Sequence, residues 1–183
     1  GEFEVATQYV VGCDGAWSPV REALGIKLVD LHFDEPWLVV DALPKPGCRL
    51  PTINLQICDP ARPTTCLPLG PGRHRWEFMM RPGETSEQVL EDSFIQKLLA
   101  PWNADVEIDR KAVYRFHGLI AEQWRKGRVL IAGDAAHQTP PFAGQGMCAG
   151  IRDASNLAWK LASVLKGDAA ADILDTYQVE REP

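Results

Sequence analysis

The residues best suited to chemistry lie in one stretch, 128–147. An apolar run ends at Gly133-Asp134, a Pro140-Pro141 turn follows, and Gly144-Gln145-Gly146 opens a helical pattern. A carboxylate directly after a buried strand can accept hydrogen bonds from a sugar or polyol hydroxyl. The first N–H groups of a helix have no intrahelical partner and can bind an anion or an oxygen that gains negative charge. The segment predicts a ligand site with both properties.

Each part of this stretch also has an ordinary structural explanation. An isolated Gly-Asp pair more often caps a turn, and an isolated Gly-x-Gly is usually a glycine bend before a helix. The pieces are informative because they occur together at short offsets, with Ala135-Ala136-His137 between them. We interpret His137 as a packed or hydrogen-bonded turn residue and Arg152-Asp153 as a structural or solvated ion pair.

A second strand, turn and helix unit precedes this one. Asp14-Gly15 follows an apolar run at 8–12, Ser18 is a good N-cap, and Pro19 suits the first helical position. Asp14 could contact a cofactor hydroxyl, and Arg21 could pair with Asp14 or with a phosphate. A purely structural Asp–Arg pair explains the same residues equally well.

Composition excludes several classes of protein. The chain has 183 residues, 45% of them hydrophobic, and a formal net charge of −6. This is typical of a globular domain and argues against nucleic-acid binding, which normally needs a basic surface. The five cysteines form no Cys-x-x-Cys pair, and no apolar run is long enough for a membrane span. We expect a cytoplasmic protein without a metal site, and no hydrolase motif occurs, so a cofactor must supply any difficult chemistry.

The element pattern changes along the chain. Between residues 31 and 120, Pro and Gly separate short β-rich runs that predict an antiparallel sheet. Strands are predicted at 37–41, 52–58, 65–69, 74–80 and 106–116. Helices are predicted from Ser18 to Leu24, from the capping box Thr85–Gln88 to Pro101, from about Gly146 to Leu165, and over roughly 170–182. The long helix carries apolar residues at helical spacing, namely Met147, Ile151, Ala154, Ala158, Leu161 and Leu165.

Two segments together resemble the group A flavoprotein aromatic monooxygenases, which fold like p-hydroxybenzoate hydroxylase. The first is Gly12–Arg21, which matches the family motif D-G-x-x-S-x-x-R, and the second is Gly133–Leu161, which matches the Gly-Asp motif and its following helix. The segment 174–181 is also similar to the family. Within the family, the chain is most similar to the 3-(3-hydroxyphenyl)propionate hydroxylase type.

The resemblance implies FAD as cofactor, NAD(P)H as reductant, and O₂ with an aromatic small molecule as substrates. A phenol would be hydroxylated through a flavin C4a-hydroperoxide, and a homodimer is a candidate assembly. Asp134 would bind the ribityl chain, and Asp14 with Arg21 would support the pyrophosphate region. Pro141 and Phe142 would lie at the flavin face and contribute to catalysis. The remaining predicted FAD-binding residues are Gly133, Gly144, Gln145, Gly146, Met147 and Cys148. For the substrate wall we name Asn54, Gln56, Trp76, Phe78, Met80 and His117, although core packing is the more common role for each.

The expected fold is mixed α and β, with a central antiparallel substrate sheet flanked by parts of an incomplete Rossmann-like FAD-binding domain. The predicted divisions are 1–30 and 121–183 for FAD binding and 31–120 for substrate binding. The family's N-terminal G-x-G-x-x-G is absent, and both ends look abrupt, so a fragment is expected and a small complete domain is the alternative. Other functions remain open, namely a substrate-domain fragment without FAD, another flavin chemistry, or a binding module.

Overall fold

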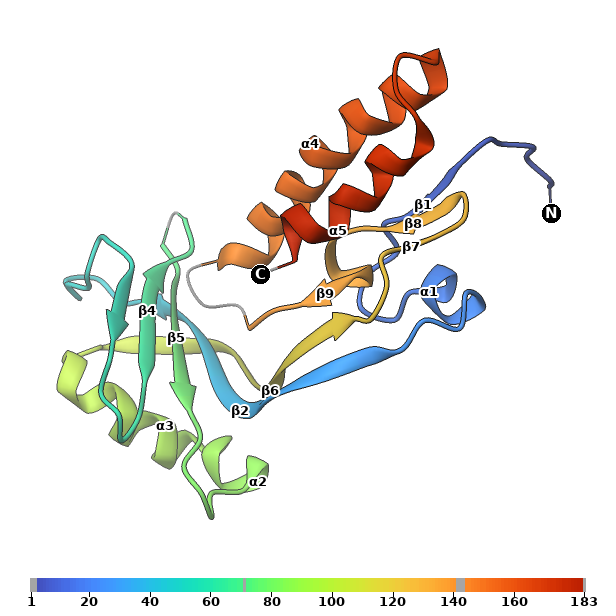
Figure 1. Ribbon diagram of the computed structural model, residues 1–183. Helices are drawn as coiled ribbons and strands as arrows, with labels where there is room; N and C mark the ends of the chain where they lie inside the picture. The colour runs from blue at the N-terminus through green and yellow to red at the C-terminus, as the bar shows by residue number, and fades with distance from the viewer. Residues whose placement is uncertain (1–2, 71, 141–143, 183) are drawn as a thin grey trace. The chain divides into compact units, whose positions relative to one another are not determined.

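The computed structural model describes residues 3–70, 72–140 and 144–182 (Figure 1). The chain divides into two compact units, one formed by Gly1–Phe33 with His117–Pro183 and the other by Asp34–Phe116. Two long strands, β2 (Leu28–Pro44) and β6 (Val106–Ala121), run from one unit into the other. The boundaries predicted at residues 30 and 120 therefore lie inside strands. Separate FAD-binding and substrate-binding roles for the segments stay a prediction.

The first unit contains a small sheet with strand order β1-β8-β7. Strand β1 (Val10–Gly12) pairs in parallel with β8 (Val129–Ile131), and β7 (Arg125–Lys126) pairs antiparallel with β8. Parallel strands need a long connection, and here the second unit is part of it. The edge strand β1 is shorter than the predicted run at 8–12.

Helices and short elements follow the sheet strands of this unit. The strand β1 leads to α1 (Pro19–Ala23), whose N-cap Ser18 accepts a hydrogen bond from the Arg21 N–H as predicted. The strand β8 leads through the 3-10 turn η2 (Gly133–Ala135) and β9 (His137–Gln138) toward α4 (Gln145–Lys166). The chain closes with the 3-10 turn η4 (Ala171–Asp175) and α5 (Thr176–Arg181), beside α4 in Figure 1.

A buried cluster holds these elements together. Leu130 and Ile131 of β8 are fully buried and pack with Trp124 and with Tyr177 of α5. The Tyr177 hydroxyl donates to the Ile131 carbonyl at 3.3 Å, and burial raises the pKa of this phenol. The end of β8, where Gly133-Asp134 begins, is therefore anchored by packing on several sides.

The second unit is an antiparallel sheet with helices on one face. Strand order is β3 (Leu55–Ile57), β4 (Thr64–Pro68), β5 (His74–Met79), β2 and β6. The helices are α2 (Ser86–Val89) and α3 (Asp92–Leu99), followed by the 3-10 turn η1 (Ala100–Trp102). Trp76 of β5 lies opposite Cys66 and Val40, and all three are buried with the helix residues. Because side chains alternate along a strand, Arg75 and Glu77 belong to the other face.

One helix prediction needs correction. The capping box of Thr85 and Gln88 is present, but α2 ends at Val89 and a new helix begins at Asp92. The reason is local, because Glu91 is extended (φ −69°, ψ 136°) and serves as the next N-cap. The predicted single helix over this region is wrong.

The apolar stripe of α4 is largely exposed. Met147, Ile151 and Leu165 are 75%, 60% and 52% exposed, whereas Asp153, Leu157 and Lys160 are buried. The start and end of the helix agree with expectation to within one residue, and Gly167 closes it at φ 81°. No helix within the described ranges has both the length and the apolar character to cross a membrane.

The turn after β1 gives a direct test of the packing. A Cβ added to Gly12 would lie 2.9 Å from both Cβ and Cγ1 of Val20 and 3.2 Å from the Asp14 carboxylate. Such contacts force the helix α1 away from the strand end, so we expect Gly12→Ala to lower the free energy of unfolding by about 2 kcal/mol. Urea denaturation checks this. Gly146→Ala is the control, since Gly146, like Gly12, has no positive φ, and the nearest atom to its added Cβ, Thr139 Oγ1, is 4.0 Å away. Equal losses in the two variants would contradict the packing argument.

Candidate functional site

A groove of about 410 Å³ opens where β1 and β8 end and α4 begins. Its walls come from the turn after β1, from the end of β8 with η2, and from the first turns of α4. The lining residues are Cys13, Gly15, Ala132, Gly133, Asp134, Met147, Gly150, Ile151 and Ala154. Met147, Ile151 and Ala154 of α4 are exposed to solvent and form one wall of this groove.

Asp134 supplies the groove with a free acceptor. It lies in η2 directly after β8, and its side chain is exposed. Its carboxylate takes part in no hydrogen bond or ion pair with a residue that the structure describes. A carboxylate held in this way by a buried strand can accept hydrogen bonds from a ligand's hydroxyl groups.

Glycines allow a ligand to approach this carboxylate. Gly133 has φ 61°, a left-handed conformation that favours glycine. An added Cβ on Gly133 would meet the Cα of Gly150 at 3.9 Å, and one on Gly150 would meet the Cα of Gly133 at 3.7 Å. The turn and the helix therefore pass close together, and neither places a side chain between the backbone and a ligand.

The first turn of α4 offers N–H groups. Gly144 is the N-cap with φ 64°, and no side chain caps the helix. The N–H groups of Gln145, Gly146 and Met147 are consequently the ones without an intrahelical acceptor. By helix geometry the N–H of Cys148 is placed to donate to the Gly144 carbonyl. Of the Met147 and Cys148 N–H groups, which we expect at the pyrimidine edge of the flavin, only that of Met147 thus lacks an intrahelical acceptor, and the contact itself stays a prediction.

A buried carboxylate, Asp153, holds the Gly133 turn against α4. Asp153 is fully buried, and its Oδ2 accepts the Gly133 N–H at 3.0 Å and lies 2.6 Å from His137 Nε2. Its Oδ1 accepts a hydrogen bond from Arg181 Nε at 2.9 Å. Burial opposes ionisation of Asp153, but the hydrogen bonds from His137, Arg181 and Gly133 prevail and hold its pKa below the ordinary value.

These contacts confirm one interpretation and correct another. His137 is buried and hydrogen-bonded, as expected for a turn residue. Asp153 does not pair with Arg152, because the Arg152 guanidinium donates to Gln145 Oε1 instead. Neighbours along a helix point in different directions, so adjacent opposite charges are poor evidence of an ion pair.

The residues after β1 are arranged as a structural support. Asp14 Oδ2 accepts the Val20 N–H at 2.9 Å and stabilises the start of α1. Buried Arg21 donates to the carbonyls of Ala135 and Ala16 at 2.9 and 2.8 Å. Arg21 thereby ties the turn after β1 to η2. A role for either side chain in phosphate binding stays a prediction.

The predicted substrate residues do not form one group. Trp76, Phe78 and Met80 are buried on the face that the helices cover. Gln56 Oε1 accepts a hydrogen bond from the Thr65 hydroxyl at 3.0 Å, and Asn54 is exposed. His117 belongs to the first unit and lines a small pocket there with Trp17 and Leu119. Pro141 and Phe142 lie outside the described residues, so their predicted role at the flavin face stays a prediction.

Sequence reasoning missed Gly150 and the support given by Asp153. A signal for Gly150 existed, because glycine inside a helix costs about 1 kcal/mol relative to alanine and so calls for a packing reason. Gly146 and Gly150 are also four residues apart, on one side of α4. The sequence offered no comparable signal for the partners of Asp153.

Residues 1–183 match a family model described as an FAD binding domain. The chain belongs to this FAD-binding family. The site agrees with that assignment, because it combines a free carboxylate, close-packed glycines and helix N–H groups. These fit the ribityl hydroxyls and the oxygen-bearing pyrimidine edge of a flavin. The predicted resemblance to the flavoprotein aromatic hydroxylases is confirmed by the following relatives.

A probable NADH-specific resorcinol 4-hydroxylase of Rhodococcus jostii is 47% identical over 99% of the chain. A 3-(3-hydroxy-phenyl)propionate/3-hydroxycinnamic acid hydroxylase of Burkholderia cenocepacia is 43% identical over 98% of it. Aklavinone-11 hydroxylase, solved with FAD and aklavinone, matches 95% of the chain with a TM-score of 0.80 and 35% identity, and the match spans 34% of that protein. The chain spans about a third of the curated relatives it matches, 34% and 33% respectively.

Proposed function

We propose that this chain is part of an enzyme that uses FAD, NADH and O₂ to hydroxylate a phenolic substrate. The observation that carries the proposal is the free carboxylate of Asp134 at the end of β8, in a groove lined by Gly133 and Gly150. Relatives that are 47% and 43% identical to the chain are named as hydroxylases of resorcinol and of 3-(3-hydroxy-phenyl)propionate. These are phenols, so a phenol is the substrate class proposed here.

FAD would supply the redox chemistry, by accepting a hydride equivalent from NADH and activating O₂ for transfer of one oxygen atom. The chain's own residues would bind and orient it. Asp134 would accept hydrogen bonds from the ribityl hydroxyls. The N–H groups at the start of α4 would face the pyrimidine edge of the ring and stabilise negative charge there.

The apolar wall of the groove would exclude water from the flavin. Met147 and Ile151 are highly exposed along α4 and line the groove together with Ala154. A cofactor seated on them would cover this apolar surface. Because a dry site strengthens the hydrogen bonds made to the flavin, the same residues would also support charge stabilisation.

The first experiment measures FAD binding by the natural protein that contains this sequence. Flavin-free protein is titrated with FAD, and quenching of flavin fluorescence is followed. We expect saturation at one FAD per chain. Gly150→Leu should weaken binding, because its side chain would enter the groove, and Ala169→Leu serves as a control outside it. An absence of saturable binding, or equal affinity in both variants, would contradict the proposal.

A second experiment separates hydroxylation from other flavin chemistry. NADH oxidation is measured with resorcinol and with 3-(3-hydroxyphenyl)propionate, and the products are analysed by chromatography. The proposal expects a hydroxylated product in proportion to the NADH consumed. Phenol-stimulated NADH oxidation without any such product would favour a different reaction on the same cofactor. Homodimer formation stays a separate prediction.

A further inference from the structure

A pocket in the second unit lies apart from the groove described above. It has a volume of about 650 Å³ and lies between α3 and the strands β4 and β5. This volume is in the range typical of small-molecule sites. All its lining residues fall within 57–102, so the pocket belongs to one compact unit.

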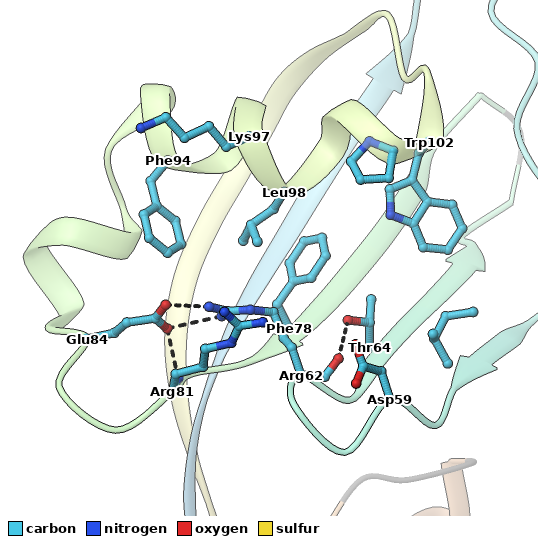
Figure 2. Close-up of a pocket in the computed structure, with 12 residues that line it drawn as sticks. Asp59, Arg62, Thr64, Phe78, Arg81, Glu84, Phe94, Lys97, Leu98 and Trp102 are labelled. Atoms are coloured by element: carbon cyan, nitrogen blue, oxygen red, sulfur yellow. Dashed lines mark hydrogen bonds and ion pairs between the residues drawn. The ribbon is translucent and has the colours of Figure 1, made fainter.

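Aromatic and aliphatic side chains from β5, α3 and η1 line this pocket. Figure 2 shows Phe94 and Leu98 descending from α3 toward Phe78 of β5, with Trp102 at one end. Phe78 is 2% exposed and therefore rigidly packed, whereas Phe94 and Trp102 are only partly buried. Trp102 is also held edge-to-face against Trp76, with ring centroids 6.2 Å apart. The opening suits a flat apolar group such as an aromatic ring.

One arginine of the lining is already neutralised. Arg62 donates to both carboxylate oxygens of Glu84 and to the Met79 carbonyl, and its guanidinium lies 5.9 Å from the centre of the Phe94 ring. The Arg62 side chain keeps only 10% of its surface exposed. Burial opposes ionisation of Glu84, but the hydrogen bonds from Arg62 and the Arg81 N–H prevail and hold its pKa below the ordinary value. This pair forms a fixed polar wall without net charge.

A second arginine retains unused donors. Arg81 is exposed and donates from Nε to the Ala61 carbonyl at 3.1 Å, which holds its side chain over the Asp59–Arg62 turn. Its two terminal amino groups form no hydrogen bond with any residue in the described ranges. Asp59, the other acid of the lining, accepts the Ala61 N–H at 2.9 Å. Lys97 adds positive charge at the rim, although its amino group points away from the pocket in Figure 2.

We propose that this pocket binds an aromatic carboxylic acid. The ring would lie among Phe78, Phe94 and Trp102, and the carboxylate would accept two hydrogen bonds from the terminal amino groups of Arg81. Paired donors from a guanidinium match the geometry of a carboxylate, and charge-assisted bonds of this kind are strong. A neutral amide of the same shape could accept through its single carbonyl oxygen only, and it would lack the charge that strengthens these bonds. The proposal does not depend on FAD binding.

The test is calorimetric titration of the natural protein with 3-phenylpropionate, and with 3-phenylpropionamide as a neutral analogue of the same size. We expect saturable binding of the acid and at least tenfold weaker binding of the amide. Arg81→Gln should weaken acid binding at least tenfold and make the two ligands similar. Arg49→Gln is the matched control, because Arg49 is an exposed arginine of the same unit outside the pocket lining. It should bind as the wild type does.

The variants also localise the site. Arg81→Lys keeps the charge but loses the paired donors, so we expect an affinity between those of the wild type and Arg81→Gln. Urea unfolding of each variant checks that the fold is intact. Undetectable binding of the acid by the wild type, equal binding of acid and amide, or wild-type affinity in Arg81→Gln would each overturn the proposal. Failure of FAD binding would leave it standing, so the two proposals fail separately.

Discussion

Asp153→Asn is expected to lower the free energy of unfolding by about 3 kcal/mol, because it leaves a charged partner without its counter-ion at a buried site. Asp153 is fully buried and accepts hydrogen bonds from Gly133, His137 and Arg181. An asparagine side chain carries no charge and presents an NH₂ group to one of these donors. The Arg181 side chain, only 20% exposed, would lose its anionic partner.

Urea denaturation monitored by tryptophan fluorescence measures this loss. Asp168→Asn is the control, because Asp168 is exposed just after α4 and its side chain has no partner in the described chain. We expect the control to change stability by less than about 0.5 kcal/mol. A similarly small change in Asp153→Asn would show that the buried cluster does not hold the turn.

The same carboxylate predicts a pH dependence of stability. Its folded pKa lies below the ordinary value of 3.8, so its contribution is fully present above that value and is lost as the pH falls through the lowered pKa. Below about pH 4, the free energy of unfolding of Asp153→Asn should therefore fall less steeply with decreasing pH than that of the wild type. Measuring the free energy of unfolding against pH for both proteins tests this. Parallel curves would mean that the pKa of Asp153 is the same in the folded and unfolded protein.

Asp134→Ala is expected to weaken FAD binding by roughly tenfold to a hundredfold while leaving stability almost unchanged. The reason is that Asp134 is exposed and bonds to no residue that the structure describes, so its carboxylate is free for the ligand. Fluorescence titration with FAD measures the binding, and urea denaturation measures the stability. Asp134→Asn keeps one acceptor oxygen and should lie between the two.

This prediction separates a binding role from a structural one. Asp153→Asn should lower stability and, because it displaces the Gly133 turn, should also lower FAD affinity. Asp134→Ala should lower FAD affinity alone. If Asp134→Ala destabilised the chain as much as Asp153→Asn, the free carboxylate would instead be part of the packing. Wild-type FAD affinity in Asp134→Ala would remove the main support for the proposed function.

The motif layout was predictable because local chemistry dictates it. Ser18 and Thr85 are N-caps by side-chain type, and their spacing to the next helical residues specifies the helix starts. Gly167 ends α4 because only a left-handed residue fits there. The Gly133-Asp134 pair is placed by a short buried strand, which the apolar run predicts directly.

The orientation of α4 was not predictable from periodicity. An apolar stripe predicts a face that avoids water, but it does not distinguish a packed core from the wall of a ligand groove. Met147 and Ile151 line the groove, whereas Asp153 and Lys160 are buried with polar partners. Their burial was not predictable because their partners, Arg181 and Thr176, come from α5, which follows α4 later in the chain.

The long strands were underestimated for a related reason. Pro36 lies inside β2, and its carbonyl accepts the Met80 N–H, although a proline usually limits a strand. Gly118 lies inside β6, where an added Cβ would be 3.2 Å from the Phe33 Cβ. Both residues look like strand ends in the sequence. The strands β2 and β6 can continue through these two residues because of their neighbours in the sheet, and the sequence alone does not show which strands those are.

The most direct test of the account is an oxygen-labelling measurement. The natural protein is loaded with FAD and supplied with NADH, a phenol and ¹⁸O₂, and the product is analysed by mass spectrometry. The account predicts a hydroxylated product that carries one labelled oxygen atom and that is absent without FAD or without NADH. A product whose new oxygen comes from water, or the absence of any hydroxylated product from FAD-loaded protein across the phenols tested, would contradict it.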